Sequence, residues 1–278
     1  MKNLLSLMTL TKTELNQIFD VASQMRRIAT ASYKKGPQLI GSVVGTVYGK
    51  PNPSSTAFAL ATNYLSGMVC PVFGSDDVLQ QCRAMDNMGV NAVVVASKND
   101  NLVQTFANGA RCGVVNAGSG QYDPIGVLAD LLTLHDKLDT LQNISVSVVG
   151  NKHTNKINEF ARCLQLFGSD LIWYLPTEDF VTPRKGIVID NIEGAFSGAD
   201  AIVDIGLSAF SDPAKYYGST GGIPEKLVDL ARIDVPLLGS RHVVDNIGSK
   251  NYLHNCVTVR DTNYVSVAMA VLYLMHKV

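Results

Sequence analysis

The stretch GVVNAGSGQYDPIGVLADLLTLHD, residues 113–136, combines a buried strand, a glycine-rich turn and an amphipathic helix. The helix is expected to begin at Pro124, because an acidic N-cap, here Asp123, followed by proline at the first helical position is favourable helix-start chemistry. In α/β proteins, small anionic ligands bind where the carboxyl end of a strand leads into a helix. The stretch therefore predicts the fold class and marks one place where a binding site is expected.

Strand-like and helix-like segments alternate along nearly the whole chain. Most of the strand candidates are apolar on both faces, as parallel strands covered by helices on each side must be. This alternation predicts an α/β fold with parallel sheets. The expected strands are residues 42–48, 68–73, 91–96, 113–117, 144–150, 170–175, 201–206 and 235–239. The expected helices are residues 11–28, 54–66, 75–88, 100–110, 124–137, 154–167, 222–231 and 262–277.

A seam at residues 137–143, KLDTLQN, separates two series of strands. We therefore expect two parallel-sheet α/β domains, residues 1–137 and 138–261, joined by the helix at 124–137. The last segment, 262–278, is expected to pack back on the first domain through one apolar face. The residues of that face are Val265, Ala268, Met269, Leu272 and Met275.

Composition and charge exclude several classes of protein. The 278 residues carry a net charge of −1, which gives no indication of a nucleic-acid or membrane-surface partner. There is no apolar run of membrane-spanning length and no signal-peptide pattern, so a cytoplasmic location is expected. The five cysteines form no CxxC pair and the histidines lack metal-ligand spacing. We expect neither a metal nor a cofactor.

Three stretches, in this order, carry a resemblance to a known family. LLSLMTLTKTELNQIFDVA (4–22) is similar to the opening helix of the aspartate/ornithine carbamoyltransferase family, and NAGSGQYDPIGVLADLLTLHDKLDTLQNISVSVVGN (116–151) resembles that family's Asn-Ala-Gly-Asp-Gly, His-Pro-x-Gln, Leu-Asp-Leu and Val-Gly-Asp motifs. VPLL (235–238) occurs where the family has His-Pro-Leu-Pro or His-Cys-Leu-Pro. The resemblance implies a carbamoyl-phosphate domain at 1–137, an amino-acid domain at 138–261, and a homotrimer with active sites between subunits.

The resemblance also shows which residues replace the family's carbamoyl phosphate site. Its Ser-Thr-Arg-Thr motif, which binds phosphate at a helix start, corresponds to residues 51–54, so the guanidinium is absent and two prolines each remove an N–H donor. The arginine after the third strand corresponds to Ala96. His-Pro-x-Gln becomes Asp123-Pro124-Ile125-Gly126, which places a carboxylate where the family has an imidazole.

The second domain departs from the family in the same way. The arginine after Val-Gly-Asp corresponds to Lys156, which keeps the charge but loses the bidentate fork. The substrate-binding Arg-x-Gln falls on Gly206 and Ser208, and the proline of the Leu-Pro turn becomes Leu238. The loop that a neighbouring subunit lends to the site has no counterpart in VCPVFGSDDVLQQC (69–82), where a strand leads almost directly into a helix.

Several residues remain candidates for ligand binding, each with a structural alternative. Asp123 is either a general base or an N-cap, and the serines at the start of the helix at 54–66 either donate to an anion or cap that helix. The segment GNKHTNK (150–156) is either a ligand-binding crevice or an exposed polar loop. The candidates are Ser54, Ser55, Asp123, Lys152, His153, Lys156 and Arg241.

Two functions follow from this pattern. The first is a pseudoenzyme: a non-catalytic assembly or regulatory homologue, forming a homotrimer and pairing with an active transferase or another enzyme. The second is a divergent transferase of the same fold with a rebuilt site for another small molecule. The ligand in either case is a small anion or an amino acid. The sequence assigns no catalytic residue and does not separate aspartate-type from ornithine-type ancestry.

Overall fold

The computed structural model describes residues 1–49, 52–72, 77–150, 155–174, 187–189, 191–206, 223, 225–238 and 256–277. The chain forms two compact units. The first unit comprises Met1–Ala129 together with Asp261–Val278, and the second comprises Asp130–Arg260. Helices α5 (Pro124–Leu138) and α11 (Val257–His276) each contribute residues to both units. The chain therefore passes between the units within a helix on both occasions.

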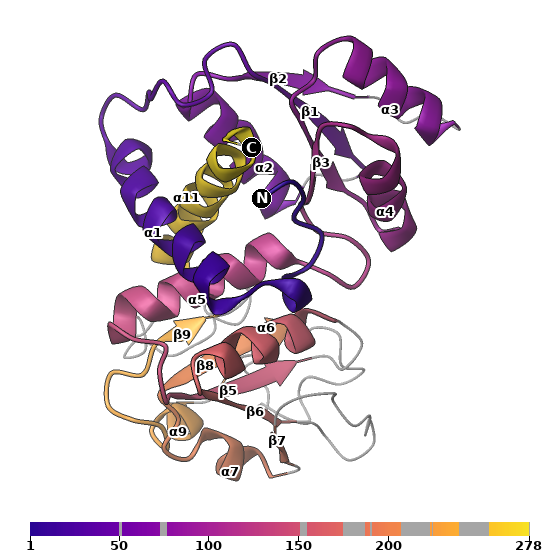
Figure 1. Cartoon of the computed structure of the whole chain (residues 1–278). Coiled ribbons are helices and arrows are strands. Elements are labelled where there is room, and N and C mark those ends of the chain that lie inside the picture. Colours follow the sequence, from indigo (N-terminus) through magenta and orange to yellow (C-terminus); the bar gives the residue numbers. More distant parts are fainter. Residues whose placement is uncertain are drawn as a thin grey trace. The chain divides into compact units, whose positions relative to one another are not determined.

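The first unit is built on a four-stranded parallel sheet (Figure 1). Its strand order is β2-β1-β3-β4, and its register pairs Val44 with Ala92 and Val93 with Val114. Runs of valine favour this pleated, doubly buried environment because β-branched side chains pack well on a sheet. The strands are β1 (Val43–Tyr48), β2 (Met68–Pro71), β3 (Ala92–Ala96) and β4 (Gly113–Asn116).

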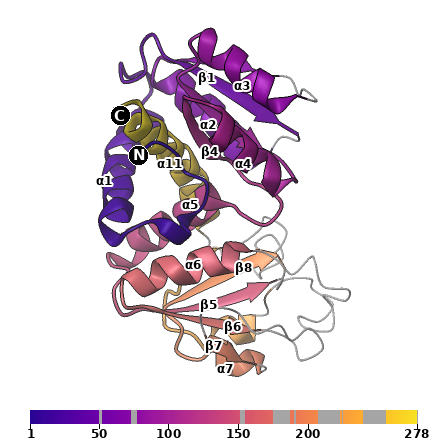
Figure 2. The same ribbon diagram turned by 45° about the vertical axis from the view of Figure 1, so that its right-hand side comes forward.

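Helices cover both faces of this sheet. Helices α3 (Val78–Asn87) and α4 (Asp100–Gly109) lie on one face, where Phe106 is fully buried among strand valines. Helices α1 (Lys12–Thr30), α2 (Pro53–Tyr64) and the first-unit part of α11 lie on the other face (Figures 1 and 2). The predicted parallel α/β fold is confirmed for this unit.

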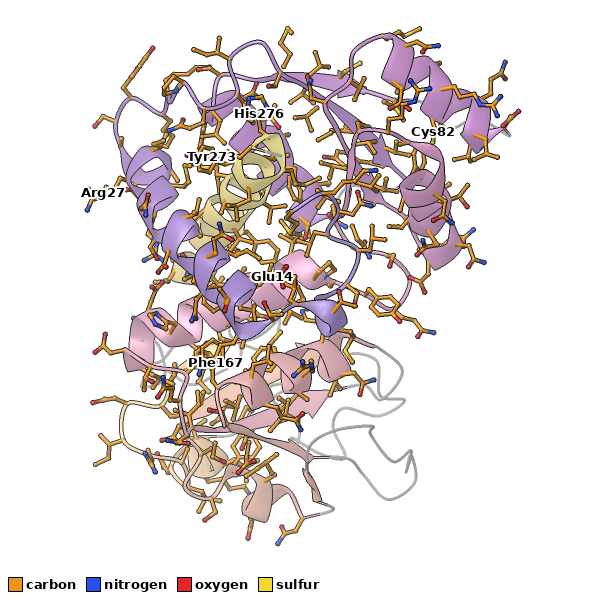
Figure 3. The ribbon with its side chains drawn as sticks, viewed as in Figure 1. Glu14, Arg27, Cys82, Phe167, Tyr273 and His276 are labelled. Carbon is orange, nitrogen blue, oxygen red and sulfur yellow. The ribbon has the colours of Figure 1, made fainter. Side chains whose placement is uncertain are left out.

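Local chemistry accounts for where the helices begin. Helix α1 has a capping box, in which the Glu14 N–H donates to the Thr11 hydroxyl at 3.2 Å and the Glu14 carboxylate accepts from the Thr11 N–H at 2.8 Å. Glu14 is labelled in Figure 3. The Thr11 N–H and the Thr11 hydroxyl both donate to the Glu14 carboxylate, and these two hydrogen bonds hold the pKa of Glu14 below its usual value. Helix α11 differs from the expectation of a single apolar face. Eleven of its residues, including Asn263 and Ser266, are buried, so the helix is enclosed around most of its circumference.

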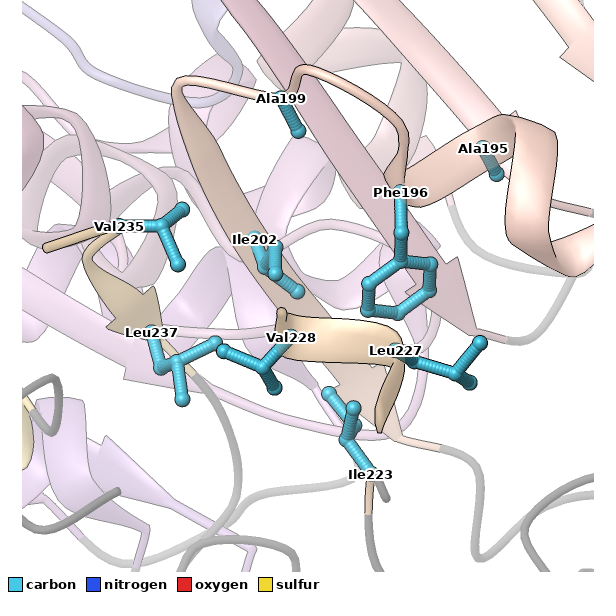
Figure 4. Close-up of a cluster of buried hydrophobic side chains, with 9 residues drawn as sticks. All are labelled: Ala195, Phe196, Ala199, Ile202, Ile223, Leu227, Val228, Val235 and Leu237. Carbon is cyan, nitrogen blue, oxygen red and sulfur yellow. The ribbon is translucent and has the colours of Figure 1, made fainter. Parts of the chain in front are cut away.

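The second unit has a five-stranded parallel sheet in the order β7-β6-β5-β8-β9. Helices α7 (Ile192–Phe196) and α9 (Glu225–Val228) pack on one face through the apolar cluster around Phe196 and Ile202 (Figure 4). Helix α6 (Asn155–Leu166) lies on the opposite face (Figure 2). The strands are β5 (Ser145–Gly150), β6 (Asp170–Tyr174), β7 (Ile187–Ile189), β8 (Ala201–Gly206) and β9 (Leu237–Leu238).

Three elements of the second unit differ from the prediction. Strand β7 and helix α7 were not expected, because three and five residues are too few to show a period. Helix α9 covers 225–228 and not the whole of 222–231. The overall arrangement of two parallel α/β sheets is as predicted. Within the described part of the chain, the helices are all too short or too polar to cross a membrane.

Candidate functional site

The first unit has a cavity at the point where its chain connections diverge. Strand β1 continues through α2 towards β2, whereas β3 continues through α4 towards β4 on the other side of the sheet. Parallel α/β sheets bind ligands at such a switch point, beyond the carboxyl ends of the strands. The cavity measures about 690 Å³. Its lining consists of Gly49, Asn52, Pro53, Ser54, Ala96, Ser97, Lys98, Asn99, Gly118, Ser119, Tyr122, Asp123 and Tyr264.

Helix α2 begins at this cavity with a complete capping box. The Asn52 Oδ1 atom accepts from the Ser55 N–H at 2.7 Å, and the Ser55 hydroxyl accepts from the Asn52 N–H at 2.9 Å. Pro53, the first helical residue, has no N–H. Both serines are buried, but Ser55 takes part in the cap, whereas Ser54 lines the cavity.

Helix α5 begins at the same cavity and is capped by Asp123. The Gly126 N–H donates to Asp123 Oδ1 at 3.0 Å, and the Ser54 hydroxyl donates to the same oxygen at 3.5 Å. The N-cap expected at Asp123 is confirmed. The tertiary structure thus brings together two predicted candidates, Ser54 and Asp123, which are 69 positions apart.

Helix α4 is the third helix that begins here. Its N-cap, Asn99, accepts from the Asn101 N–H at 3.0 Å, and its first turn contains Asp100. The N-terminus of a helix binds anions because its first N–H groups lack partners and its dipole is positive there. At this cavity, a side chain of the protein itself accepts from one first-turn N–H of each of the three helices, which removes that donor from a phosphate.

The charged side chains among the described lining residues are Lys98 and Asp123. Lys98 is exposed and follows β3, while Asp123 is half-buried. Ala96, at the end of β3, also lines the cavity, and its backbone carbonyl accepts from the Gly49 N–H at 2.9 Å. Sequence reasoning missed Lys98, although the polar turn SKND directly after the valine-rich strand was a usable signal. It also missed Tyr264, which comes from α11 and which only the tertiary structure places here.

The candidate Lys156 lies in the second unit and is part of an ion-pair cluster. Its Nζ is 3.6 Å from Asp130 Oδ2, and Asp130 also pairs with the Arg260 guanidinium. Asp130 is 2% exposed, and the side chains of Lys156 and Arg260 are each 16% exposed. Much of the Lys156 charge is therefore balanced within the protein. The candidates Lys152, His153 and Arg241 lie outside the described residues.

Burial shifts the pKa of several ionisable groups outside the cavity lining. The Tyr48 hydroxyl donates to the Ser55 carbonyl at 3.1 Å, and burial raises the pKa of Tyr48. All five cysteines are free, and Cys82 (Figure 3) is among the three that are buried. Burial raises the pKa of Cys112 and of Cys163 to about 12, so both stay protonated at neutral pH. No group of three or more His, Cys, Asp or Glu residues in the described ranges could hold a metal ion.

Comparisons with known proteins agree with this architecture. The family described as "Aspartate/ornithine carbamoyltransferase, carbamoyl-P binding domain" matches residues 2–136. The aspartate carbamoyltransferase catalytic subunit of Carboxydothermus hydrogenoformans is 27% identical, over 99% of this chain and 96% of that protein.

Solved structures show the same fold over the whole chain. The ornithine carbamoyltransferase of Pyrococcus furiosus superposes with a TM-score of 0.85 at 17% identity, covering 99% of this chain and 97% of that one. Aspartate transcarbamoylase of Trypanosoma cruzi, solved with carbamoyl aspartate and phosphate, gives a TM-score of 0.82 at 16% identity, covering 98% and 95%. The resemblance seen in the sequence is confirmed: the chain belongs to the aspartate/ornithine carbamoyltransferase family.

Proposed function

We propose that this protein is a non-catalytic assembly or regulatory homologue of the carbamoyltransferases, in which the carbamoyl phosphate site is lost. One observation carries the proposal. The three helices that begin at the cavity are capped by Asn52, Asn99 and Asp123, so in each helix one first-turn N–H group that could hold a phosphate donates to the protein itself. Two of these helices also begin with a proline.

The charges of the cavity support the same proposal. Transfer from carbamoyl phosphate depends on positioning and on stabilising the charge of the leaving phosphate. The described lining contains no guanidinium, and its carboxylate, Asp123, repels an anion. Two like charges 4 Å apart repel by about 1 kcal/mol in water and by about 4 kcal/mol near a protein surface. Loss of a single oxyanion donor costs about 2.7–4 kcal/mol in other enzymes, so several losses together would abolish turnover.

We expect no measurable transfer from carbamoyl phosphate to aspartate or ornithine. The measurement is a colorimetric assay for carbamoyl aspartate and citrulline on the purified protein, together with calorimetric titration of carbamoyl phosphate. The aspartate carbamoyltransferase catalytic subunit of Carboxydothermus hydrogenoformans, run at the same concentration, is the positive control. Measurable turnover by this protein, or micromolar affinity for carbamoyl phosphate, would refute the loss of the site.

We further propose that the protein is a cytoplasmic homotrimer that associates through the first unit. The relatives are named catalytic subunits, which describes parts of larger assemblies. In this chain, β2 lies at the edge of its sheet, and the nearby Ile40 and Met68 are 68% and 57% exposed. An unpaired strand edge flanked by exposed apolar side chains favours association with another chain.

Light scattering measures this association directly. The expected mass at micromolar concentration is that of three chains of 29.9 kDa. Replacing Met68 and Ile40 together by lysine is expected to shift the mass to that of a single chain, while the exposed Ile233 of the second unit (94% exposed) serves as the control site. A wild-type protein that scatters as a monomer contradicts the proposal.

The cavity also favours the second candidate function, a divergent transferase acting on another small molecule. A volume of about 690 Å³ lies within the range of small-molecule sites. A carbamoyltransferase-like reaction would need an activated donor, and the described lining offers an ammonium, a carboxylate and several hydroxyls for one. Product formation from a different activated carbonyl donor would favour this alternative over the non-catalytic role.

A further inference from the structure

We propose that the cavity at the switch point of the first unit binds a small zwitterion, whose cationic nitrogen faces Asp123 and whose carboxylate faces Lys98. The inference rests on the proposed function, because it assumes that carbamoyl phosphate no longer occupies this place. It goes further by naming the chemical class of ligand that the altered cavity selects.

The charges of the lining carry the first step. The described lining residues contribute one ammonium, Lys98, and one carboxylate, Asp123. A dianion is attracted by the Lys98 ammonium and repelled by the Asp123 carboxylate. A simple cation is attracted by Asp123 and repelled by Lys98. A molecule with one charge of each sign is the class that complements both groups, because electrostatic complementarity sets which ligand a site admits.

The carboxylate has a defined orientation. Asp123 Oδ1 accepts from the Gly126 N–H at 3.0 Å and from the Ser54 hydroxyl at 3.5 Å. A Cβ atom added to Gly126 would come within 2.7 Å of the Tyr264 hydroxyl and would collide with the Asp123 carboxylate. Asp123 and Tyr264 therefore pack closely against the first turn of α5, and this packing restricts the movement of the carboxylate.

The loop that precedes Asp123, which also lines the cavity, is preorganised. The Asn116 side chain donates to the Ser119 hydroxyl at 3.1 Å and accepts from the Gly118 N–H at 3.0 Å. Gly118 has φ +106°, and its missing Cβ leaves room for Asn52 Nδ2, which would otherwise lie 2.9 Å away. Because the loop is held before a ligand arrives, binding loses less conformational entropy. The neutral polar groups beside the two charges belong to Ser54, Ser97, Ser119, Tyr122 and Tyr264.

The experiment uses the full-length protein and amino acids that differ in the separation of their charges. Glycine, β-alanine and 4-aminobutyrate are titrated by calorimetry, alongside butyrate, n-butylammonium and inorganic phosphate. At least one of the three zwitterions is expected to bind about tenfold or more tightly than either singly charged probe and than phosphate. The distance between the two charges of the tightest-binding zwitterion then indicates how far apart the Asp123 carboxylate and the Lys98 ammonium lie.

Two variants assign the charges to their residues. Asp123→Asn removes the charge and retains a good N-cap, and Lys98→Gln removes the ammonium from an exposed position. Each is expected to weaken the best zwitterion by about tenfold or more, whereas Lys226→Gln, an exposed lysine of the second unit, leaves its affinity unchanged. Unchanged melting temperatures of the variants show that any loss of affinity does not come from unfolding.

Three results would overturn the inference: no binding of any zwitterion, binding of phosphate at least as tight as that of the best zwitterion, or unchanged affinity in Asp123→Asn. The two proposals fail separately. Carbamoyl transfer in the assay above refutes the loss of the family's site, while an inactive protein that ignores all three zwitterions refutes the ligand class alone.

Discussion

Replacing Asp130 by alanine is expected to lower the unfolding free energy of the second unit by about 3 kcal/mol. Asp130 is 2% exposed and pairs with Lys156 and Arg260, whose side chains are each 16% exposed. Its removal leaves two poorly hydrated cations next to each other, without the carboxylate that offsets their charge. Breaking a buried ion pair from one side costs more than the pair itself contributes, because the remaining charges stay desolvated.

The measurement is urea unfolding followed by the fluorescence of Trp173. This residue is the single tryptophan of the chain and belongs to β6, so its emission follows the second unit. Asp229→Ala, at an exposed position of the same unit, is the matched control and is expected to change the stability by less than about 0.5 kcal/mol.

A triple variant separates the loss of the pair from the cost of unpaired charge. Asp130→Leu, Lys156→Met and Arg260→Met together remove all three charges and keep similar volumes, so most of the lost stability is expected to return. An Asp130→Ala protein as stable as the wild type would show that water reaches Lys156 and Arg260 freely, contrary to their burial.

Replacing Gly126 by glutamine, the residue of the family's His-Pro-x-Gln motif, is expected to destabilise the first unit by about 2–3 kcal/mol. A glutamine in a helix is intrinsically better than a glycine by up to about 1 kcal/mol. Here, however, the added Cβ collides with the Asp123 carboxylate and lies 2.7 Å from the Tyr264 hydroxyl. Overpacking of this kind costs about 1–3 kcal/mol, and displacing Asp123 also loses its cap, which contributes about 1 kcal/mol.

Thermal and urea unfolding followed by circular dichroism test this prediction. The double variant Asp123→Gly, Gly126→Gln is the control, because glycine is tolerated as an N-cap and removes both aspartate atoms that the added Cβ meets. It is expected to recover at least half of the stability that Gly126→Gln alone loses. If Gly126→Gln instead stabilises the protein, Asp123 and Tyr264 do not pack closely against α5. The inference that packing holds the Asp123 carboxylate in place at the zwitterion site is then wrong as well.

Local patterns in the sequence predicted most of the secondary structure correctly. The Thr11–Glu14 capping box and the Asp123 cap depend on hydrogen bonds that span three residues, so their signal lies within a few positions of the chain. The valine-rich runs predicted the central strands, because parallel strands are buried on both faces. Strand β7 and helix α7 escaped the same reasoning, since neither is long enough to show a period.

The residue types at the candidate site were also visible in the sequence, but their functions were not. Ser55 was an equally good candidate for capping or for anion binding, and the structure shows its hydroxyl and N–H within the Asn52 capping box. From the sequence, Lys156 was expected to keep the positive charge of the arginine that the family has after Val-Gly-Asp. Its balance by Asp130 depends on a contact between α5 and α6 that no local pattern contains.

The sequence by itself determined the parallel α/β fold and the family. Only the tertiary structure decided which residues lie next to one another: Ser54 and Asp123, Asp130 and Arg260, and Tyr264 and Gly126. The physical reason is the separation along the sequence of the residues that interact. Caps and periodicity act over a few residues, whereas these pairs are separated by about 70 to 140 positions and meet only when the strands pair and the helices pack on the sheets.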